Sequence, residues 1–237
     1  MQLVLPVTFT KHNGFETLVE GENAPLIDFL KNVLVNQDPT QHKQASQRIC
    51  VVDGSKGAGK THLLLAINEM AMRYGLSHQY LNISSMLNMP VEVLGGTIDS
   101  QVLCLDDIHT AIQNPIWERG LFDVINQFVE HDNRLLLLAS AKPVTELTIA
   151  LPDLTTRLQW GVNFSLKPLS DNDKVAALRQ HATALGLRFQ DDALKYIITR
   201  VSRDMHALMD YLEQLDAASL QNKRKLTIPF IKSIIGT

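Results

Sequence analysis

Short apolar runs alternate with segments of helical spacing over the first two thirds of the chain. Four apolar runs predict strands, at 49–52, 79–83, 102–105 and 135–138. Near-continuous runs of this kind suit strands that are buried on both faces. Apolar residues recur at helical spacing over 26–34, 60–74 and 116–129. Strands that alternate with helices predict an α/β fold, with a parallel sheet flanked by helices.

The pattern changes near residue 166, because only helical spacing is visible beyond it. Helices are predicted at 170–186, 191–200, 203–221 and from 227 onward. Ser170 and Asp173 form a capping-box-like start to the first of these helices. The chain is therefore predicted to have three parts: a flexible arm at 1–14, an α/β domain at 15–165 and a small all-helical domain at 166–237.

Composition excludes several classes of protein. The 237 residues carry a formal net charge of -3, without the basic excess that is usual for a duplex-DNA-binding protein. No apolar run reaches the roughly 18 residues of a membrane span, and the N-terminus lacks a secretion signal. The cytoplasm is the expected compartment. Cys50 and Cys104 lie in apolar runs, so buried core residues are expected rather than metal ligands.

A phosphate-binding loop follows the first predicted strand. Residues 54–61 match the pattern G-x-x-x-x-G-K-[ST] in full, between a strand and a helix. Glycines let backbone N–H groups surround phosphate oxygens, and the following helix adds its positive N-terminus. Lys60 is expected to reach the β- and γ-phosphates, and Thr61 to bind Mg²⁺. The expected nucleotide contacts are Gly54, Ser55, Lys56, Gly57, Ala58, Gly59, Lys60, Thr61 and His62.

Two acidic residues follow the third predicted strand. Asp106 and Asp107 come directly after 102–105, and ligands gather at the carboxyl ends of parallel strands. Asp106 is expected to hold Mg²⁺, and Asp107 to orient or deprotonate a water. Two acids after a strand are more often a helix cap, but the upstream P-loop favours the catalytic interpretation.

The order of these features resembles a known family. The P-loop, the Asp106-Asp107-Ile108 segment, the apolar strand before Ser140 and the segment Thr-Arg-Leu-Gln-Trp-Gly at 156–161 resemble the AAA+ core of the bacterial replication initiator DnaA. The opening segment 15–21 also resembles that family, in which it usually lies beside the nucleotide base. The resemblance implies an AAA+ fold with a helical lid. The expected layout leaves no room for the basic helix-turn-helix domain of DnaA.

A shorter group within that family, Hda, is similar to the chain in length, at 151–161 and at 224–230. Members of this group turn the initiator off, and they begin with a peptide that binds the DNA polymerase sliding clamp. The resemblance places that peptide here at Gln2, Leu3, Leu5 and Pro6. Such a peptide needs a glutamine for directional hydrogen bonds and leucines for an apolar pocket. The alternative is a frayed tail or an edge strand.

The same resemblance assigns a role to Arg157. In AAA+ assemblies an arginine near the end of the α/β domain points into the nucleotide of a neighbouring subunit, and the implied neighbour is ATP-bound DnaA. Arginine fingers of this kind are worth about 10³–10⁵ in rate. The alternative is a surface arginine that pairs with Asp153 or caps a helix.

The positions that sense the nucleotide depart from the family pattern. Where DnaA-like proteins carry a lid arginine, this chain has His206, with Arg203 one turn earlier. Ala141 stands where the family usually has aspartate, next to Ser140. A neutral histidine is a weak substitute for an always-charged guanidinium. These changes predict slow hydrolysis by the chain itself, while the P-loop predicts tight diphosphate binding.

The sequence therefore predicts a regulatory AAA+ adaptor that binds ADP or ATP with Mg²⁺. It would dock on the sliding clamp, promote hydrolysis of DnaA-bound ATP and so prevent re-initiation of replication. Contact with DNA would be indirect, through the clamp, and a homodimer remains open. The alternative is an ATP-hydrolysing protein of the helicase-loader or DNA-remodelling type.

Overall fold

The computed structural model describes residues 14–35, 45–97, 99–131, 133–187, 189, 191–200, 202, 204–222 and 227–235. Five strands form one sheet: β1 (Ile49–Asp53), β2 (His78–Asn82), β3 (Val102–Asp106), β4 (Leu135–Ser140) and β5 (Val162–Ser165). The α-helices of the N-terminal part are α1 (Ala24–Val35), α2 (Lys60–Arg73), α3 (Pro115–Glu130) and α4 (Pro152–Trp160). Those of the C-terminal part are α5 (Asp171–Ala184), α6 (Asp191–Arg200), α7 (Met205–Asn222) and α8 (Ile228–Ile235).

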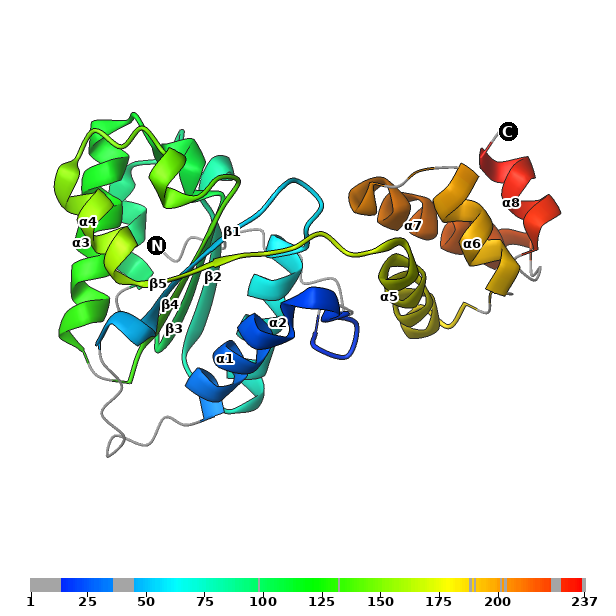
Figure 1. The fold of residues 1–237 in the computed structure, drawn as a ribbon, viewed down its shortest axis with the longest axis horizontal. Coiled ribbons are helices and arrows are strands. Elements are labelled where there is room, and N and C mark those ends of the chain that lie inside the picture. Colours follow the sequence, from blue (N-terminus) through cyan, green and yellow to red (C-terminus); the bar gives the residue numbers. More distant parts are fainter. Residues whose placement is uncertain are drawn as a thin grey trace.

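The sheet has the strand order β2-β3-β4-β1-β5, and each pair of neighbours is parallel. β1, β3 and β4 occupy the three central positions, and almost all their side chains are buried. This explains their near-continuous apolar sequences, since helices cover both faces of the sheet. Figure 1 shows the sheet with helices on either side.

Successive residues of each central strand contribute to opposite cores. On one face, Ile49, Val51 and the alternate residues of β3 and β4 pack with α3 and α4. On the other face, Cys50, Val52 and their neighbours pack with α1 and α2. The period of two along a strand produces this division. It places the P-loop helix α2 and the helix α4, which carries Arg157, on opposite faces of the sheet.

The α4–β5 segment was not identified as a helix and a strand from the sequence. α4 has only nine residues, and β5 is an edge strand of four residues whose side chains are exposed or half-buried. Neither therefore has a long apolar signature. Gly161 joins the two elements, and a Cβ there would lie 2.7 Å from the carbonyl oxygen of Ile49. A glycine is required because the backbone passes so close to β1.

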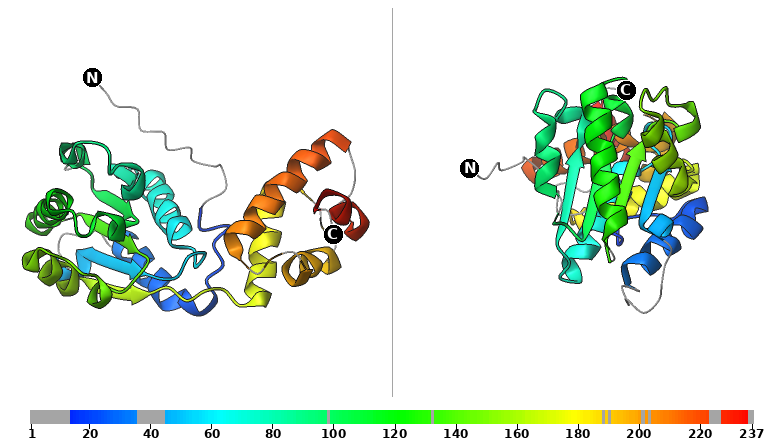
Figure 2. Two further views of the ribbon diagram at one scale, coloured as in Figure 1. Left: turned by 90° about the horizontal axis from the view of Figure 1, so that it is seen from above. Right: turned by 90° about the vertical axis from the view of Figure 1, so that its left-hand side faces the viewer.

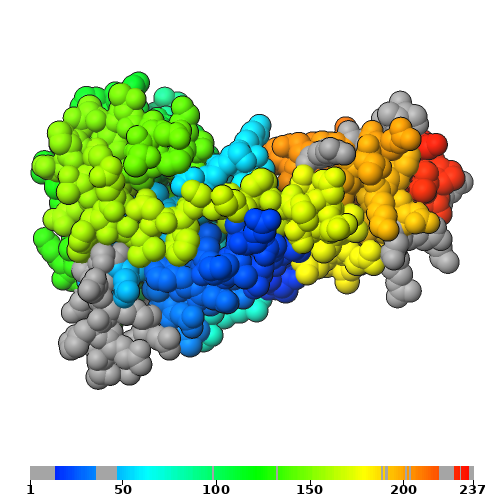
Figure 3. Space-filling model, viewed as in Figure 1, coloured from blue at the N-terminus to red at the C-terminus, as the bar shows by residue number. Residues whose placement is uncertain are grey.

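The C-terminal helices enclose a third apolar core, built around Leu178, Leu194, Ile197, Leu212 and Ile231. Figure 2 shows these helices as a separate group beside the α/β part, joined to it through the stretch after β5. In Figure 3 the opening segment, in dark blue, lies between the α/β part and α5. The AAA+ α/β fold with a helical lid is confirmed. The boundary at residue 165 stays a prediction.

Membrane insertion through a helix finds no support in the described part of the chain. None of its helices is both long enough and apolar enough to cross a membrane.

Candidate nucleotide site

The P-loop leaves β1 at Gly54 and enters α2 at Lys60. Gly57 has φ 79° and Gly59 has φ 101°, conformations that L side chains rarely adopt. A Cβ on Gly54 would lie 3.0 Å from the carbonyl oxygen of Leu166, so this position also needs a glycine. The glycines of the motif are therefore explained by backbone shape. The loop opens at the N-terminus of α2, where backbone N–H groups attract anions.

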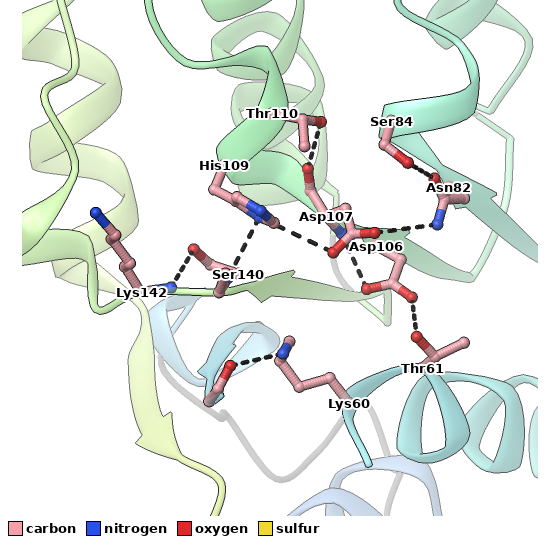
Figure 4. A network of polar contacts seen from close by, with 12 residues as sticks. Lys60, Thr61, Asn82, Ser84, Asp106, Asp107, His109, Thr110, Ser140 and Lys142 are labelled. Atoms are coloured by element: carbon pink, nitrogen blue, oxygen red, sulfur yellow. Dashed lines mark hydrogen bonds and ion pairs between the residues drawn. The ribbon is translucent and has the colours of Figure 1, made fainter. Parts of the chain in front are cut away.

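The side chain of Lys60 lies back over the loop. Its Nζ donates to the carbonyl oxygens of Gly54 at 2.6 Å and Ser55 at 3.1 Å (Figure 4). Burial lowers the pKa of Lys60, and the nearby carboxylates of Asp106, Asp107 and Asp53 oppose that shift. The ammonium group thus stands at the loop with replaceable carbonyl partners, which suits a lysine that binds phosphate oxygens.

Thr61 and Asp106 converge at the end of β3. Thr61 Oγ1 donates to Asp106 Oδ2 at 2.6 Å, and Tyr80 Oη donates to the same oxygen at 3.0 Å. A hydroxyl and a carboxylate next to a phosphate loop are the hard oxygen ligands that Mg²⁺ prefers. The donor set therefore fits a magnesium ion, which Thr61 and Asp106 would hold.

The carboxyl group of Asp106 is fully buried. Burial raises its pKa above the ordinary value of 3.8, with a further contribution from the charge of Asp107. The hydrogen bonds from Thr61 and Tyr80 partly oppose this rise. A buried charge without a counter-ion costs folding free energy, and a bound cation would relieve that cost.

The carboxylate of Asp107 is held by Asn82 and lies near His109. Asn82 Nδ2 donates to Asp107 Oδ2 at 3.3 Å, and His109 Nδ1 lies 3.9 Å from Asp107 Oδ1 (Figure 4). The backbone of Asp107 is left-handed, with φ 54°. Such strain is often found at functional sites. Asp107 also lines a cavity that borders the P-loop.

Ser140 lies at the end of β4, close to this network, and is fully buried. Its hydroxyl accepts a hydrogen bond from the N–H of Lys142 at 3.2 Å. The N–H of Ala141 instead donates to His109 Nδ1 at 3.2 Å. His109, which follows β3, therefore connects the ends of β3 and β4, whereas residue 141 has no charged side chain to do so.

A cavity of about 460 Å³ lies between the P-loop and the lid. This volume is within the usual range for small-ligand pockets. Its walls come from the opening segment, the P-loop and α2, and the lid helices α5 and α7. The lining residues include Thr17, Leu18, Val19, Lys60, His62, Ala177, His181, Met205, His206 and Met209. The rings of His62 and His181 meet edge to face at 5.4 Å, so α2 and the lid are in contact.

Most of the predicted nucleotide residues are brought together here, while other predicted site residues lie elsewhere. His206 lines the cavity from α7, but Arg203 lies outside the described residues. Gln2, Leu3, Leu5 and Pro6 also lie outside them. Arg157 is not among the cavity-lining residues. It lies on α4, half-buried, with its guanidinium carbon 5.8 Å from the ring centroid of Trp160.

Comparison with known proteins assigns the α/β part. Residues 9–165, well over half of the chain, match the bacterial DnaA ATPase domain. The chain belongs to the DnaA family. Within this family it carries an Hda-type lid, since residues 171–235 match the lid domain of Hda. Both findings agree with the resemblance to Hda that the sequence shows.

Solved structures of DnaA and of RuvB share the fold at low sequence identity. Domain III of Thermotoga maritima DnaA has a TM-score of 0.79 at 18% identity, covering 95% of this chain and 96% of that one. AMPPCP-bound DnaA from Aquifex aeolicus has a TM-score of 0.69 at 17% identity, covering 90% of this chain and 68% of that one. The Thermotoga maritima RuvB branch migration motor has a TM-score of 0.62 at 15% identity, covering 88% and 68% respectively.

Sequence reasoning missed three polar residues of the site, namely Tyr80, Asn82 and His109. Tyr80 and Asn82 belong to β2, which is the neighbour of β3, so both strands end at the same edge of the sheet. The rule that side chains at the carboxyl ends of parallel strands meet could have found Asn82. His109 has no such signal, because its contact depends on the turn after Asp107.

Replacing Asp106 by asparagine is expected to raise the melting temperature of the nucleotide-free protein by a few degrees at pH 7–8. The raised pKa means that the charged carboxylate costs stability above its folded pKa, and this cost disappears as the pH falls through that value toward 3.8. The gain from Asp106→Asn should therefore shrink in acid. Thermal denaturation between pH 4 and pH 8 measures it, with Asp99→Asn as the control. A variant that is less stable at every pH would contradict the account.

Proposed function

We propose that this chain is a nucleotide-bound regulatory adaptor of replication initiation. It binds ADP or ATP at its own P-loop, docks on the DNA polymerase sliding clamp and promotes hydrolysis of the ATP bound to DnaA. Its action inactivates the initiator and prevents re-initiation of replication. It acts in the cytoplasm. Membership of the DnaA family and the Hda-type lid support a role in replication control.

Nucleotide binding is supported by the loop, the magnesium-type donor pair and the cavity under the lid. Lys60 would hold phosphate oxygens, and Thr61 with Asp106 would hold Mg²⁺. A bound Mg²⁺ would neutralise phosphate charge and orient the β- and γ-phosphates. The AMPPCP-bound DnaA of similar fold supports the same use of the cavity.

Slow hydrolysis by the chain itself is supported by the surroundings of Asp107. Asn82 holds the carboxylate that would activate a water. On the lid side, the cavity is lined by His206, which is a weaker partner for a γ-phosphate than arginine. Both observations favour a protein that retains nucleotide over one that turns it over rapidly.

One observation carries the proposal of action on a partner. Arg157 lies on α4, across the sheet from the helix α2 that begins at the chain's own P-loop. The cavity under the lid is lined by other residues. Its position away from the chain's own nucleotide site supports a role for Arg157 on a nucleotide that a neighbouring molecule would hold. Trp160, 42% exposed, lies beneath the guanidinium and gives it a flat surface to rest on.

The clamp is proposed as the partner of residues 2–6 because their sequence fits a glutamine-and-leucine docking peptide. Docking on a ring loaded on DNA would raise the local concentration of the adaptor near the initiator. This step needs no direct contact with bases, in keeping with the net charge of -3.

A Gln2→Ala/Leu5→Ala double variant tests the clamp step. We expect it to lose clamp binding and at least about tenfold of the stimulated hydrolysis, because the effective concentration near DnaA falls. Surface plasmon resonance on immobilised clamp and phosphate release from DnaA-bound ATP measure the two effects. Thr8→Ala/Thr10→Ala, in the same arm, is the matched control. Undiminished clamp binding by the Gln2/Leu5 variant would refute the docking peptide.

The alternative, an ATPase of the helicase-loader or remodelling type, is favoured by the intact Asp107 at the cavity. It predicts rapid hydrolysis by the isolated chain. Asn82→Ala removes the hydrogen bond that holds the carboxylate of Asp107. If the chain is such an ATPase, its rate of ATP hydrolysis should then change only slightly. If it is an adaptor, we expect its slow intrinsic rate of ATP hydrolysis to rise.

A further inference from the structure

Glu118, on α3, is a fully buried carboxylate to which neither the nucleotide site nor the clamp peptide assigns a role. Its Oε1 accepts hydrogen bonds from the N–H groups of Gln113 at 2.8 Å and Ala150 at 3.1 Å. Its Oε2 accepts one from the N–H of Leu151 at 2.8 Å. Three backbone donors thus converge on one buried charge, and hydrogen bonds of this charge-assisted kind are short and directional.

Two of these donors belong to the start of α4. Leu151 is the N-cap residue of that helix, and it supplies no side-chain cap. Pro152, at the first helical position, has no N–H to offer. The carboxylate of Glu118 therefore binds the N–H of the N-cap residue from another helix, as the glutamate of a capping box does locally, and its negative charge suits the positive N-terminus of α4.

Arg157 lies six residues beyond Leu151 on this nine-residue helix. Leu154 and Leu158 bury the inner side of α4 in the core that it shares with α3. Apolar packing decides which side of a helix faces inward, but the hydrophobic effect that drives it is non-directional. The hydrogen bonds to Glu118 are directional, and they hold the backbone at the start of α4.

We propose that Glu118 is a positioning residue for the arginine finger: by holding the N–H groups of Ala150 and Leu151 it sets where α4 presents Arg157 to the partner's nucleotide. This inference rests on the proposed action of Arg157 on DnaA-bound ATP. A finger must meet the transferring phosphoryl group closely, because a displacement of about 1 Å at a reacting centre can cost about 10²-fold in rate. The sequence offers no sign of this role beyond a glutamate in the first turn of a helix.

Glu118→Gln is the decisive variant, since it keeps the shape and places an NH₂ group against one of the three N–H donors. We expect faster amide hydrogen exchange in the peptide covering residues 147–158. The maximal rate of stimulated DnaA-bound ATP hydrolysis should fall at least about tenfold. The adaptor concentration that gives half-maximal stimulation, the clamp affinity and the ADP affinity should stay within about twofold of wild type, because the docking surfaces are unchanged.

Two controls separate positioning from general stability. Glu130→Gln makes the same chemical change at the exposed end of α3 and should behave as wild type. Val33→Ala, in the core on the opposite face of the sheet, lowers the melting temperature without touching α4. At temperatures below its own melting temperature, the Val33→Ala variant should give the same maximal rate of stimulated hydrolysis as wild type.

The outcomes distinguish the two levels of the account. Stimulation by wild type with an undiminished maximal rate in Glu118→Gln overturns the positioning role alone. The positioning role is also overturned if Glu118→Gln weakens clamp binding and ADP binding as much as it lowers the stimulated rate, since that pattern indicates a globally damaged protein. Absence of stimulation by wild type overturns the proposed function and this inference with it.

Discussion

Replacing Arg157 by alanine is expected to lower the stimulated hydrolysis of DnaA-bound ATP by about 10³-fold or more, close to the unstimulated rate. The guanidinium would lose its contact with the charge that spreads over the transferring phosphoryl group. Arg157 lies on the outer side of α4 with Trp160, so the loss should leave the fold intact. Phosphate release from DnaA preloaded with labelled ATP, with clamp on DNA present, measures the effect.

The controls for Arg157 follow from its surroundings. Arg157→Lys keeps the charge but loses the planar fork, and we expect it to recover only a small part of the rate. Arg200→Ala removes an exposed arginine at the end of α6 in the lid, and it should stimulate as wild type does. Clamp and ADP binding should be unchanged in all three variants. Full stimulation by Arg157→Ala would show that no finger acts from α4.

Lys60→Ala is the second change with a large expected effect. We expect ADP affinity to fall at least about 100-fold, which corresponds to about 2.7 kcal/mol of binding free energy. The ammonium group is held over the loop by the carbonyl oxygens of Gly54 and Ser55. Among the described residues of this loop, 54–61, the other cationic side chain is that of Lys56, which is exposed. Isothermal titration calorimetry gives the affinity directly.

The same variant should also change the thermal response to nucleotide. A ligand that binds only the folded state stabilises it by an amount set by its concentration relative to Kd. Wild type should therefore melt at a higher temperature with saturating ADP, and Lys60→Ala should show little or no rise. Lys195→Ala, at an exposed lid position, is the matched control. An unchanged ADP affinity in Lys60→Ala would place the nucleotide away from this loop.

The sequence predicted the parts of the fold in which local pattern and tertiary position agree. The leucines of β4 and the β-branched run of β1 are buried on both faces, so their sequences resemble strands without further context. The P-loop could also be recognised, because its residues match the motif in full between a strand and a helix. These constraints act within a few residues, and a linear pattern captures them.

The rest depends on contacts between distant segments. Glu118 is an ordinary helix residue in the sequence, and its role appears only when α3 lies beside the start of α4. Asn82 likewise becomes part of the site because β2 is the neighbour of β3 in the sheet. The short α4 and β5 have too few buried positions to give a period. Long-range partners of this kind cannot be read from propensity or spacing.

The central claim is that this chain promotes hydrolysis of a nucleotide that another protein holds. The most direct test is single-turnover hydrolysis of labelled ATP bound to DnaA, with clamp on DNA and this chain loaded with unlabelled ADP. The account predicts a large increase in labelled phosphate release that depends on Arg157. Labelled release equal to that of DnaA alone, together with rapid ATP turnover by the isolated chain, would contradict it and identify the protein as an ATPase in its own right.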